Sequence, residues 1–338
     1  MRGMAGLVSP PTTDALIDKY GRRISYLRLS ITDRCDFRCT YCMTDAMQFL
    51  PRESVLSLED CLRLARCFVG LGVRKVRITG GEPLVRRNVM WLLERLGALP
   101  GLDNLVLTTN GSQLPHFAPA LKAAGVKRLN ISLDTLRAGR FRAITRIGEL
   151  NKVLAGIEAA GAAGFTRTKI NTVLMRGVND DEFVDLVHFA VAKGLDISFI
   201  EEMPLGAIDR QRAPIGAEEV RAELARHFSL TASDESTGGP ARYWRLPDSP
   251  TRIGFIEPHS HNFCASCNRV RVTARGELYP CLGHNDTVDL LPSLRAGACD
   301  EELKQQLRVS MGMKALQHDF TQQMEAPQVV RFMSMTGG

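Results

Sequence analysis

The chain has 338 residues, of which 44% are hydrophobic and 24% are charged, and these values are ordinary for a soluble globular protein. No apolar run approaches the roughly 18 to 20 residues that a membrane-spanning helix needs, and residues 1–11 lack the apolar core of a signal peptide. We therefore expect a cytoplasmic protein that does not bind membranes. The net charge of +6 is spread thinly, without a dense run of Lys and Arg, which argues against a nucleic-acid-binding surface.

The first two thirds of the chain alternate between strand and helix patterns. Residues 1–17 show no pattern and are expected to form a mobile arm. A strand over residues 24–31 then leads into a loop with three cysteines, and Ser57 with Asp60 has the spacing of a capping box at a helix start. The pattern continues with strands over residues 75–79, 105–108, 126–133, 168–174 and 197–203 and with helices over residues 88–96, 117–124, 150–160 and 180–193.

This alternation predicts an α/β fold with a parallel sheet and right-handed βαβ connections. Six such units fit either an open, doubly wound sheet or a partial barrel, and the periodicity does not distinguish the two. The polar, glycine-rich residues 233–240 are predicted to link residues 18–232 to a smaller C-terminal domain over residues 241–338. In that domain we expect helices near the end, a hairpin around Gly276, and strands over residues 243–245 and 252–257.

Residues that commonly contact ligands stand in or after each of the six predicted strands. Ligands collect at the carboxyl ends of the strands in parallel α/β folds. Each position is weak evidence alone, because a glycine pair is usually a turn and a strand-end Ser or Met usually packs. Together they predict one site, and they are Cys35, Cys39 and Cys42, then Gly80-Gly81-Glu82-Pro83, Thr108-Thr109-Asn110-Gly111, Ser132, Lys169 and Met203.

The nine cysteines fall into two triads and three single residues. In a cytoplasmic protein of this size, they are better interpreted as metal ligands than as disulfides. Cys35, Cys39 and Cys42 have the spacing C-x3-C-x2-C, and soft sulfur ligands select zinc, Cu(I) or an iron–sulfur cluster. A four-iron cluster on three thiolates leaves one iron open to a substrate, whereas zinc would need a distant fourth ligand.

The second triad is Cys264, Cys267 and Cys281, with the spacing C-x2-C-x13-C. A zinc knuckle is the alternative here, because histidines that could supply a fourth ligand are close by, at His259, His261 and His284. Arg269 and Arg271 follow Cys267 and would share one face of a strand. Cys61 and Cys67 fall in an apolar helical pattern and are predicted to be core residues, and Cys299 is left over.

The first triad, with Tyr41 directly before its last cysteine, resembles the motif of the radical S-adenosylmethionine (SAM) superfamily. The run over residues 21–35 and the segment Phe263–Leu282 resemble one family within it, the GTP 3',8-cyclases, or molybdenum cofactor biosynthesis protein A. This resemblance covers about residues 18–338. It implies a partial (βα)6 barrel followed by a smaller C-terminal domain that carries a second iron–sulfur cluster.

The resemblance also assigns roles to residues. Two [4Fe–4S] clusters would be held by the two cysteine triads. The expected SAM contacts are Tyr41, Gly81, Glu82, Ser132 and Met203. The expected GTP contacts are Arg28, Arg77, Thr108, Lys169, Arg269, Val270 and Arg271.

Other positions match or depart from the family pattern. Gly337-Gly338 matches a tail that is thought to enter the family's active site. Three positions depart from the pattern, namely Asp36, Thr44 and Ser198, which stands where the family has Arg.

The implied activity is that of a lyase that converts GTP to (8S)-3',8-cyclo-7,8-dihydroguanosine 5'-triphosphate, the first step of molybdopterin biosynthesis. The expected partners are GTP, SAM and an unidentified electron donor. The sequence does not decide whether the protein forms a homodimer. Two alternatives are a radical SAM enzyme with an auxiliary cluster that modifies a peptide, and a non-enzymatic zinc protein that binds nucleic acid. The Arg269/Arg271 pair and the Gly-Gly tail argue against the first, and the lack of a basic stripe argues against the second.

Overall fold

The computed structural model describes residues 15–44, 47–206, 208, 213–318, 320 and 329–337. Residues 1–14 of the predicted arm and the terminal Gly338 lie outside this part of the chain. Within the described ranges, no helix is long and apolar enough to cross a membrane.

Twelve strands form one sheet in the order β12-β11-β10-β1-β2-β3-β4-β5-β6-β9-β8-β7. The strands are β1 Tyr26–Ser30, β2 Lys75–Thr79, β3 Asn104–Thr109, β4 Arg128–Ser132, β5 Lys169–Val173, β6 Asp196–Ile200, β7 Thr231–Ser233, β8 Arg242–Arg245, β9 Arg252–Ile256, β10 Arg269–Val272, β11 Glu277–Tyr279 and β12 Val288–Asp289.

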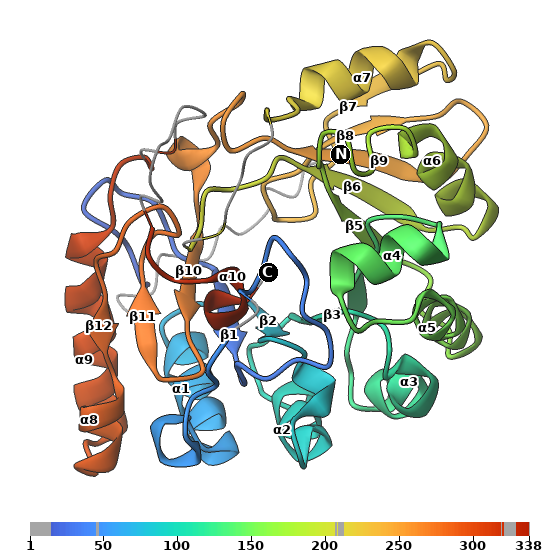
Figure 1. The fold of residues 1–338 in the computed structure, drawn as a ribbon. Helices are drawn as coiled ribbons and strands as arrows, with labels where there is room; N and C mark the ends of the chain where they lie inside the picture. Colours follow the sequence, from blue (N-terminus) through green and yellow to red (C-terminus); the bar gives the residue numbers. More distant parts are fainter. Residues whose placement is uncertain are drawn as a thin grey trace, which may run out of the picture.

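Strands β1 to β6 are parallel, and each pairs with the next in chain order. Helices connect them on the outer side of the curved sheet (Figure 1). These helices are α1 Leu58–Gly70, α2 Val89–Gly97, α3 Leu114–Ala123, α4 Ala138–Thr145, α5 Leu150–Ala162 and α6 Phe183–Ala192. The arrangement is the predicted partial (βα)6 barrel, and it decides against the open, doubly wound sheet.

Helix α1 shows how local sequence sets an element's start. The Ser57 hydroxyl accepts from the Asp60 amide at 2.9 Å, and the Asp60 carboxylate accepts from the Ser57 amide at 3.0 Å. This capping box confirms the prediction, and a cap of this kind contributes about 1 kcal/mol. Helix α4 was not predicted, because it buries only Phe141, Ile144 and Thr145 and its apolar periodicity is weak.

The C-terminal part of the chain extends both edges of the barrel sheet. Strand β9 pairs in parallel with β6, and β10 pairs in parallel with β1. The predicted hairpin around Gly276 is present as β10 and β11, with Gly276 at a φ of +94°. The predicted domain boundaries are not tested by this arrangement, although strands from both sides of residue 233 share one sheet.

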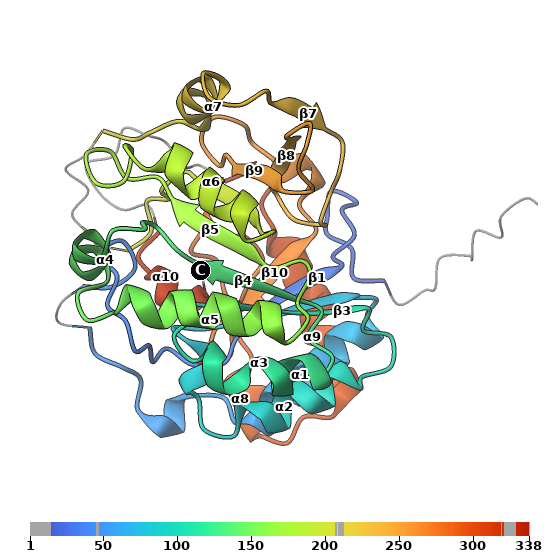
Figure 2. The same cartoon turned by 90° about the vertical axis from the view of Figure 1, so that its right-hand side faces the viewer.

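The remaining helices are α7 Ala217–Ala225, α8 Leu291–Arg295, α9 Asp300–Ser310 and α10 Met333–Thr336. Short 3-10 turns lie at Arg52–Ser54, Pro83–Val85, Cys264–Ser266 and Met311–Met313. Helix α10, at the end of the chain, lies inside the curve of the strands and against β1, as two perpendicular views show (Figures 1 and 2). The chain therefore brings its own C-terminus to the concave side of the barrel.

Candidate active site

Two pockets lie on the concave side of the sheet. The first, here called the cysteine-loop pocket, is lined by Cys35, Cys39, Cys42, Gly80, Gly81, Thr108, Thr109, Asn110 and Asp134, among others. The second, here called the central pocket, is lined by Arg28, Arg77, Lys169, Met203, Cys264, Cys267, Arg269, Val270, Arg271 and Cys281, among others. Tyr41, Ser132 and Met333 line both, so the two pockets share a wall.

The cysteine loop is anchored to the loop that follows β3. The Asp36 carboxylate accepts from the Asn110 amide group at 2.6 Å, the Ser112 hydroxyl at 2.7 Å and the Gln113 amide group at 3.0 Å. The same Asn110 group lies 3.9 Å from the Cys35 sulfur, close enough to donate to it. Asp36, one of the departures from the family pattern, therefore holds the loop in place.

The three thiols of this loop fit a bound metal–sulfur group. Burial raises the pKa of Cys35, Cys39 and Cys42, so the free thiols are neutral, and coordination to a metal is what would deprotonate them. Among the described residues, no group of three or more His, Cys, Asp or Glu side chains is arranged to hold a metal ion. The three sulfurs instead line one pocket. Cysteine thiolates are the usual ligands of iron–sulfur clusters, so the side chains present are of the type that such a cluster requires.

Gly80 and Gly81 let the β2 loop approach the cysteine loop closely. A Cβ atom at Gly80 would lie 2.5 Å from the Thr32 carbonyl oxygen, and one at Gly81 would collide with the Arg34 carbonyl. Glu82 is fully buried, and its carboxylate accepts from the Thr109 hydroxyl at 2.9 Å and from the backbone N–H of Asn110 at 2.6 Å. Burial raises the pKa of Glu82 to about 8.

Tyr41 is held by Asp134 at the wall between the pockets. Its hydroxyl donates to the Asp134 carboxylate at 2.8 Å, and the other oxygen of that carboxylate accepts from the Val173 amide at 2.8 Å. Asp134 follows β4 and was not predicted as a site residue. Its role is to fix the position of the Tyr41 ring.

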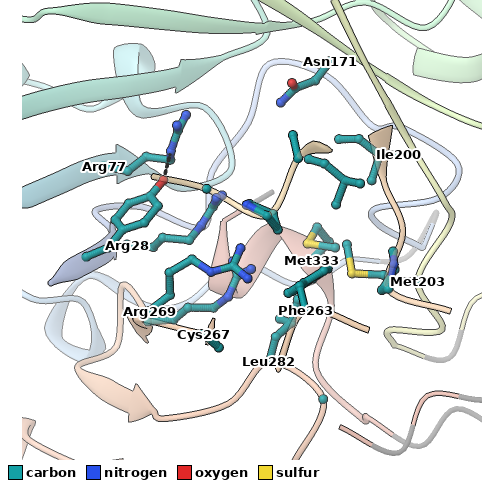
Figure 3. Close-up of a pocket in the computed structure, with 18 of the residues that line it drawn as sticks. Arg28, Arg77, Asn171, Ile200, Met203, Phe263, Cys267, Arg269, Leu282 and Met333 are labelled. Atoms are coloured by element: carbon teal, nitrogen blue, oxygen red, sulfur yellow. Dashed lines mark hydrogen bonds between the residues drawn. The ribbon is translucent and has the colours of Figure 1, made fainter. Parts of the chain in front are cut away.

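Cations form two rows across three neighbouring strands in the central pocket. In the first row, Lys75 and Arg269 flank Tyr26, and in the second, Arg77 and Arg271 flank Arg28. Like charges directly opposite each other in a sheet are destabilising, and buried cations need a counter-charge. Arg77 is only 6% exposed and Lys169 only 5%. Figure 3 shows Arg28, Arg77 and Arg269 entering the pocket from one side, opposite Ile200 and Met203.

The pKa shifts follow from this crowding of charge. Burial lowers the pKa of Lys75 to about 8, and it lowers the pKa of Lys169 as well. Burial alone would raise the pKa of Tyr26, but the charges of Arg77, Arg28 and Lys75 outweigh it and lower the value to about 6. The Tyr26 hydroxyl is the acceptor of a hydrogen bond from Arg77 (Figure 3). A strongly anionic ligand bound here would offset the repulsion among these cations and favour the protonated forms of Lys75 and Lys169.

Further polar groups that line the central pocket are buried without a hydrogen-bond partner in the part of the chain that the structure describes. They are Arg128 Nε, Asn130 Oδ1 and Asn171 Oδ1. Such atoms are costly unless a ligand or water satisfies them. They add a donor and two acceptors to the cationic rows.

The C-terminal tail reaches the same place. The Gly337 carbonyl accepts from Arg28 at 3.1 Å and from Arg271 at 3.0 Å. Gly337 has a φ of +74°, and a Cβ atom there would lie 2.5 Å from the Thr79 hydroxyl. The glycine is therefore needed for the tail to enter, while its predicted partner Gly338 lies outside the described residues.

Cys264, Cys267 and Cys281 all line the central pocket. Burial would raise the pKa of Cys267, but the positive charges of Arg269 and Lys314 outweigh it and lower the value to about 7. Two of the histidines considered as zinc ligands have other partners, because His259 Nε2 lies 2.9 Å from the Glu202 carbonyl and His284 Nε2 lies 2.8 Å from the Gln317 carbonyl. One ring nitrogen of each of these two histidines is therefore bound to a backbone carbonyl.

The structure brings most of the predicted site residues to the two pockets. Thr108, predicted as a GTP contact, lies in the cysteine-loop pocket and accepts from Arg77 at 2.9 Å. Ser198 is fully buried within β6, where a Cβ atom at Gly254 would lie 2.6 Å from its hydroxyl. Thr44, the third departure from the family pattern, is half-buried in the cysteine loop.

Sequence reasoning missed Lys75, Arg128, Asn130 and Asn171 in the central pocket. A signal was available, because side chains two residues apart in a strand share a face. Lys75 stands two residues before Arg77, and Asn130 and Arg128 stand two and four residues before Ser132, so each shares a strand face with a predicted site residue. Thr237, which also lines the central pocket, gave no such signal, because it comes from the predicted linker.

Two family models match the chain. The model described as "Radical SAM superfamily" matches residues 29–190, and the model described as "Molybdenum Cofactor Synthesis C" matches residues 195–320.

The chain is also similar to curated proteins. It is 57% identical to a protein named "GTP 3',8-cyclase" from Ectopseudomonas mendocina, over 96% of this chain and 99% of that protein. It is 58% identical to "GTP 3',8-cyclase 1" from Pseudomonas aeruginosa, over 95% of this chain and 99% of that protein.

A solved structure shares the fold. Streptococcus suis SuiB superposes with a TM-score of 0.61 at 15% identity, over 94% of this chain and 78% of SuiB. At this identity the likeness concerns the fold alone.

Proposed function

This chain belongs to the GTP 3',8-cyclase family of radical SAM enzymes, and we propose that its two adjoining pockets carry out that family's reaction. The protein converts GTP to (8S)-3',8-cyclo-7,8-dihydroguanosine 5'-triphosphate, the first step of molybdenum cofactor biosynthesis. The observation that carries this proposal is the shared wall between a three-cysteine pocket and a cationic pocket with three more cysteines. A radical formed beside one pocket can therefore reach a nucleotide held in the other.

Cys35, Cys39 and Cys42 would hold one [4Fe–4S] cluster, and Cys264, Cys267 and Cys281 would hold a second. The clusters, with SAM, supply one-electron radical chemistry when they are bound. The chain's own residues bind and orient SAM and GTP, and they exclude water from the pockets. Gly81, Glu82, the wall residues Tyr41 and Ser132, and Met203 of the central pocket are proposed to position SAM, with Asp134 fixing Tyr41.

The cationic rows are proposed to hold the triphosphate. Lys75 and Arg77 of β2 and Lys169 of β5 all line the pocket and lie close enough to affect one another's charge, so they can bind one chain of phosphates together. Arginine binds phosphate oxygens in pairs, which fixes orientation as well as charge. Thr108 supports Arg77 through its hydroxyl. No side chain is required as a strong base, because hydrogen abstraction from the ribose is a radical step.

The second triad, with Val270 beside it, is proposed to face the guanine end of the nucleotide, while Arg269 and Arg271 belong to the cationic rows that hold the triphosphate. The Gly337 carbonyl accepts hydrogen bonds from both Arg271 and Arg28, so the tail orients the two guanidinium groups. Orientation of this kind lowers the barrier by holding the reacting atoms close together.

The wider setting is also a proposal. The protein would act in the cytoplasm, receive electrons from a one-electron donor, and use GTP and SAM as its small-molecule partners. A homodimer is compatible with this function. A structure of SuiB bound to a precursor peptide shares the fold at 17% identity, so the peptide-modifying alternative is supported by fold likeness alone. The cyclase function is supported by relatives of 57% and 58% identity.

Anaerobic incubation of the reconstituted protein with SAM, GTP and dithionite tests the proposal. The expected products are 5'-deoxyadenosine, methionine and the cyclic dihydroguanosine triphosphate, identified by mass spectrometry. SAM cleavage without any change in GTP, or zinc without labile sulfide at the second triad, would overturn it.

A further inference from the structure

Lys314 is a buried lysine that contacts the second cysteine triad. It follows the short turn Met311–Met313 at the end of α9 and is 1% exposed. Its ammonium group donates to the Pro280 carbonyl at 2.6 Å, to the Arg269 carbonyl at 2.9 Å and to the Cys267 sulfur at 3.6 Å. These three bonds match the three donors that a lysine has.

These partners connect both arms of the triad. Arg269 begins β10 two residues after Cys267, and Pro280 directly precedes Cys281. Lys314 therefore bridges the two backbone segments that present two of the three thiols. It also places a positive charge beside one of the sulfurs.

Lys314 shares these surroundings with other cations, because the Arg269 charge also lies near the Cys267 thiol and two further arginines bind backbone oxygens of the triad. Arg22 donates to the Cys264 carbonyl at 2.8 Å, and Arg331 donates to the Cys281 carbonyl at 3.3 Å. Within the described ranges, no carboxylate forms an ion pair with Lys314. A buried ammonium group without an anion is costly, so the site is built to receive negative charge at the sulfurs.

We propose that Lys314 is a positioning residue that holds the second triad in its binding geometry and stabilises the reduced form of the cluster bound there. The inference rests on the proposed function, because it assumes that this triad holds a [4Fe–4S] cluster. Three thiolates and an oxidised cubane carry one net negative charge, and uptake of one electron adds a second. A nearby cation and a hydrogen bond to sulfur favour the more negative state, and both are known determinants of cluster potential.

The test uses full-length protein in which Cys35, Cys39 and Cys42 are replaced by Ala, so that one cluster remains. Dithionite titration with redox mediators, followed by electron paramagnetic resonance, measures the one-electron midpoint potential of that cluster. Three substitutions separate charge from hydrogen bonding, because Lys314→Met removes both, Lys314→Gln keeps a neutral donor, and Lys314→Arg keeps both. Lys304→Met is the matched control, because Lys304 lies on α9 before the turn Met311–Met313 and is paired with Glu301.

With Lys314→Met, we expect the equilibrium to shift at least tenfold toward the oxidised cluster, which is about 59 mV for one electron. The midpoint potential of Lys314→Arg should stay close to that of the parent protein, and Lys304→Met should leave the potential unchanged. If Lys314→Met destroys the cluster while Lys314→Arg keeps about four irons per chain, the positioning role is supported. An unchanged potential and full iron content in Lys314→Met would overturn the proposal. If the parent protein with intact Lys314 binds no iron, the assignment of the cluster itself fails.

Discussion

Replacing Gly337 by Ala tests whether the tail organises the central pocket. Gly337 has a φ of +74°, which costs a residue with a Cβ atom about 1–3 kcal/mol. The new methyl group would also lie 2.5 Å from the Thr79 hydroxyl and closer still to the Thr79 methyl group. Both effects oppose docking of the tail, so Arg28 and Arg271 would lose their shared acceptor.

The backbone penalty alone corresponds to about a 5- to 150-fold loss of the docked tail, because about 1.4 kcal/mol is a factor of ten. We expect formation of the cyclic product to fall at least tenfold in Gly337→Ala, measured anaerobically with saturating SAM. Iron content should stay the same, because no cysteine ligand is touched.

Gly297→Ala provides the matched control. Gly297 has a φ of +77°, but nothing lies within 4 Å of a Cβ atom built there. It therefore carries the same kind of backbone strain without a clash and far from the tail in sequence. Full turnover in Gly337→Ala, or an equal loss in Gly297→Ala, would refute the reasoning.

Three further predictions follow from the same pockets. Arg271→Ala and Arg269→Ala should each weaken GTP binding about tenfold with unchanged iron content, since a charge-assisted hydrogen bond contributes roughly 1.5 to 3 kcal/mol; normal GTP affinity in both variants would remove them from the site. Cys281→Ala should abolish the cyclic product but leave reductive SAM cleavage measurable as 5'-deoxyadenosine, and loss of both activities would contradict separate roles for the triads. Because burial lowers the pKa of Lys75 to about 8 and bound triphosphate would raise it again, GTP binding at pH 8 should take up protons, and affinity should fall as the pH rises further. Calorimetry in buffers of different ionisation enthalpy measures this uptake, which should be smaller in Lys75→Met; a buffer-independent enthalpy for the unsubstituted protein would rule the coupling out.

Local patterns predicted the barrel elements well. The strand at Lys75–Thr79 was predicted with its observed bounds, because β-branched residues alternate there and Gly80 follows. The α1 capping box was predicted from Ser57 and Asp60 alone, since both partners lie within one helical turn. The cysteine spacing and the residues at the strand ends led to the two pockets, because parallel strands present their carboxyl ends at one edge.

Long-range placement was out of reach of the sequence patterns. Arg28 and Gly337 are 309 residues apart, and no local pattern joins them. The strands after residue 250 pair with both edges of the barrel sheet, a topology that strand periodicity does not encode. Lys314 gave no signal, because its importance arises from three contacts made with segments 34 to 47 residues away.

The central claim is that a radical formed at the cysteine-loop pocket removes the hydrogen from C3' of a GTP molecule held in the central pocket. GTP that carries deuterium at C3' tests this claim most directly, in an anaerobic reaction with SAM and dithionite and with mass analysis of the 5'-deoxyadenosine. The account predicts that deuterium appears in 5'-deoxyadenosine together with the cyclic product. Unlabelled 5'-deoxyadenosine alongside the cyclic product would contradict it.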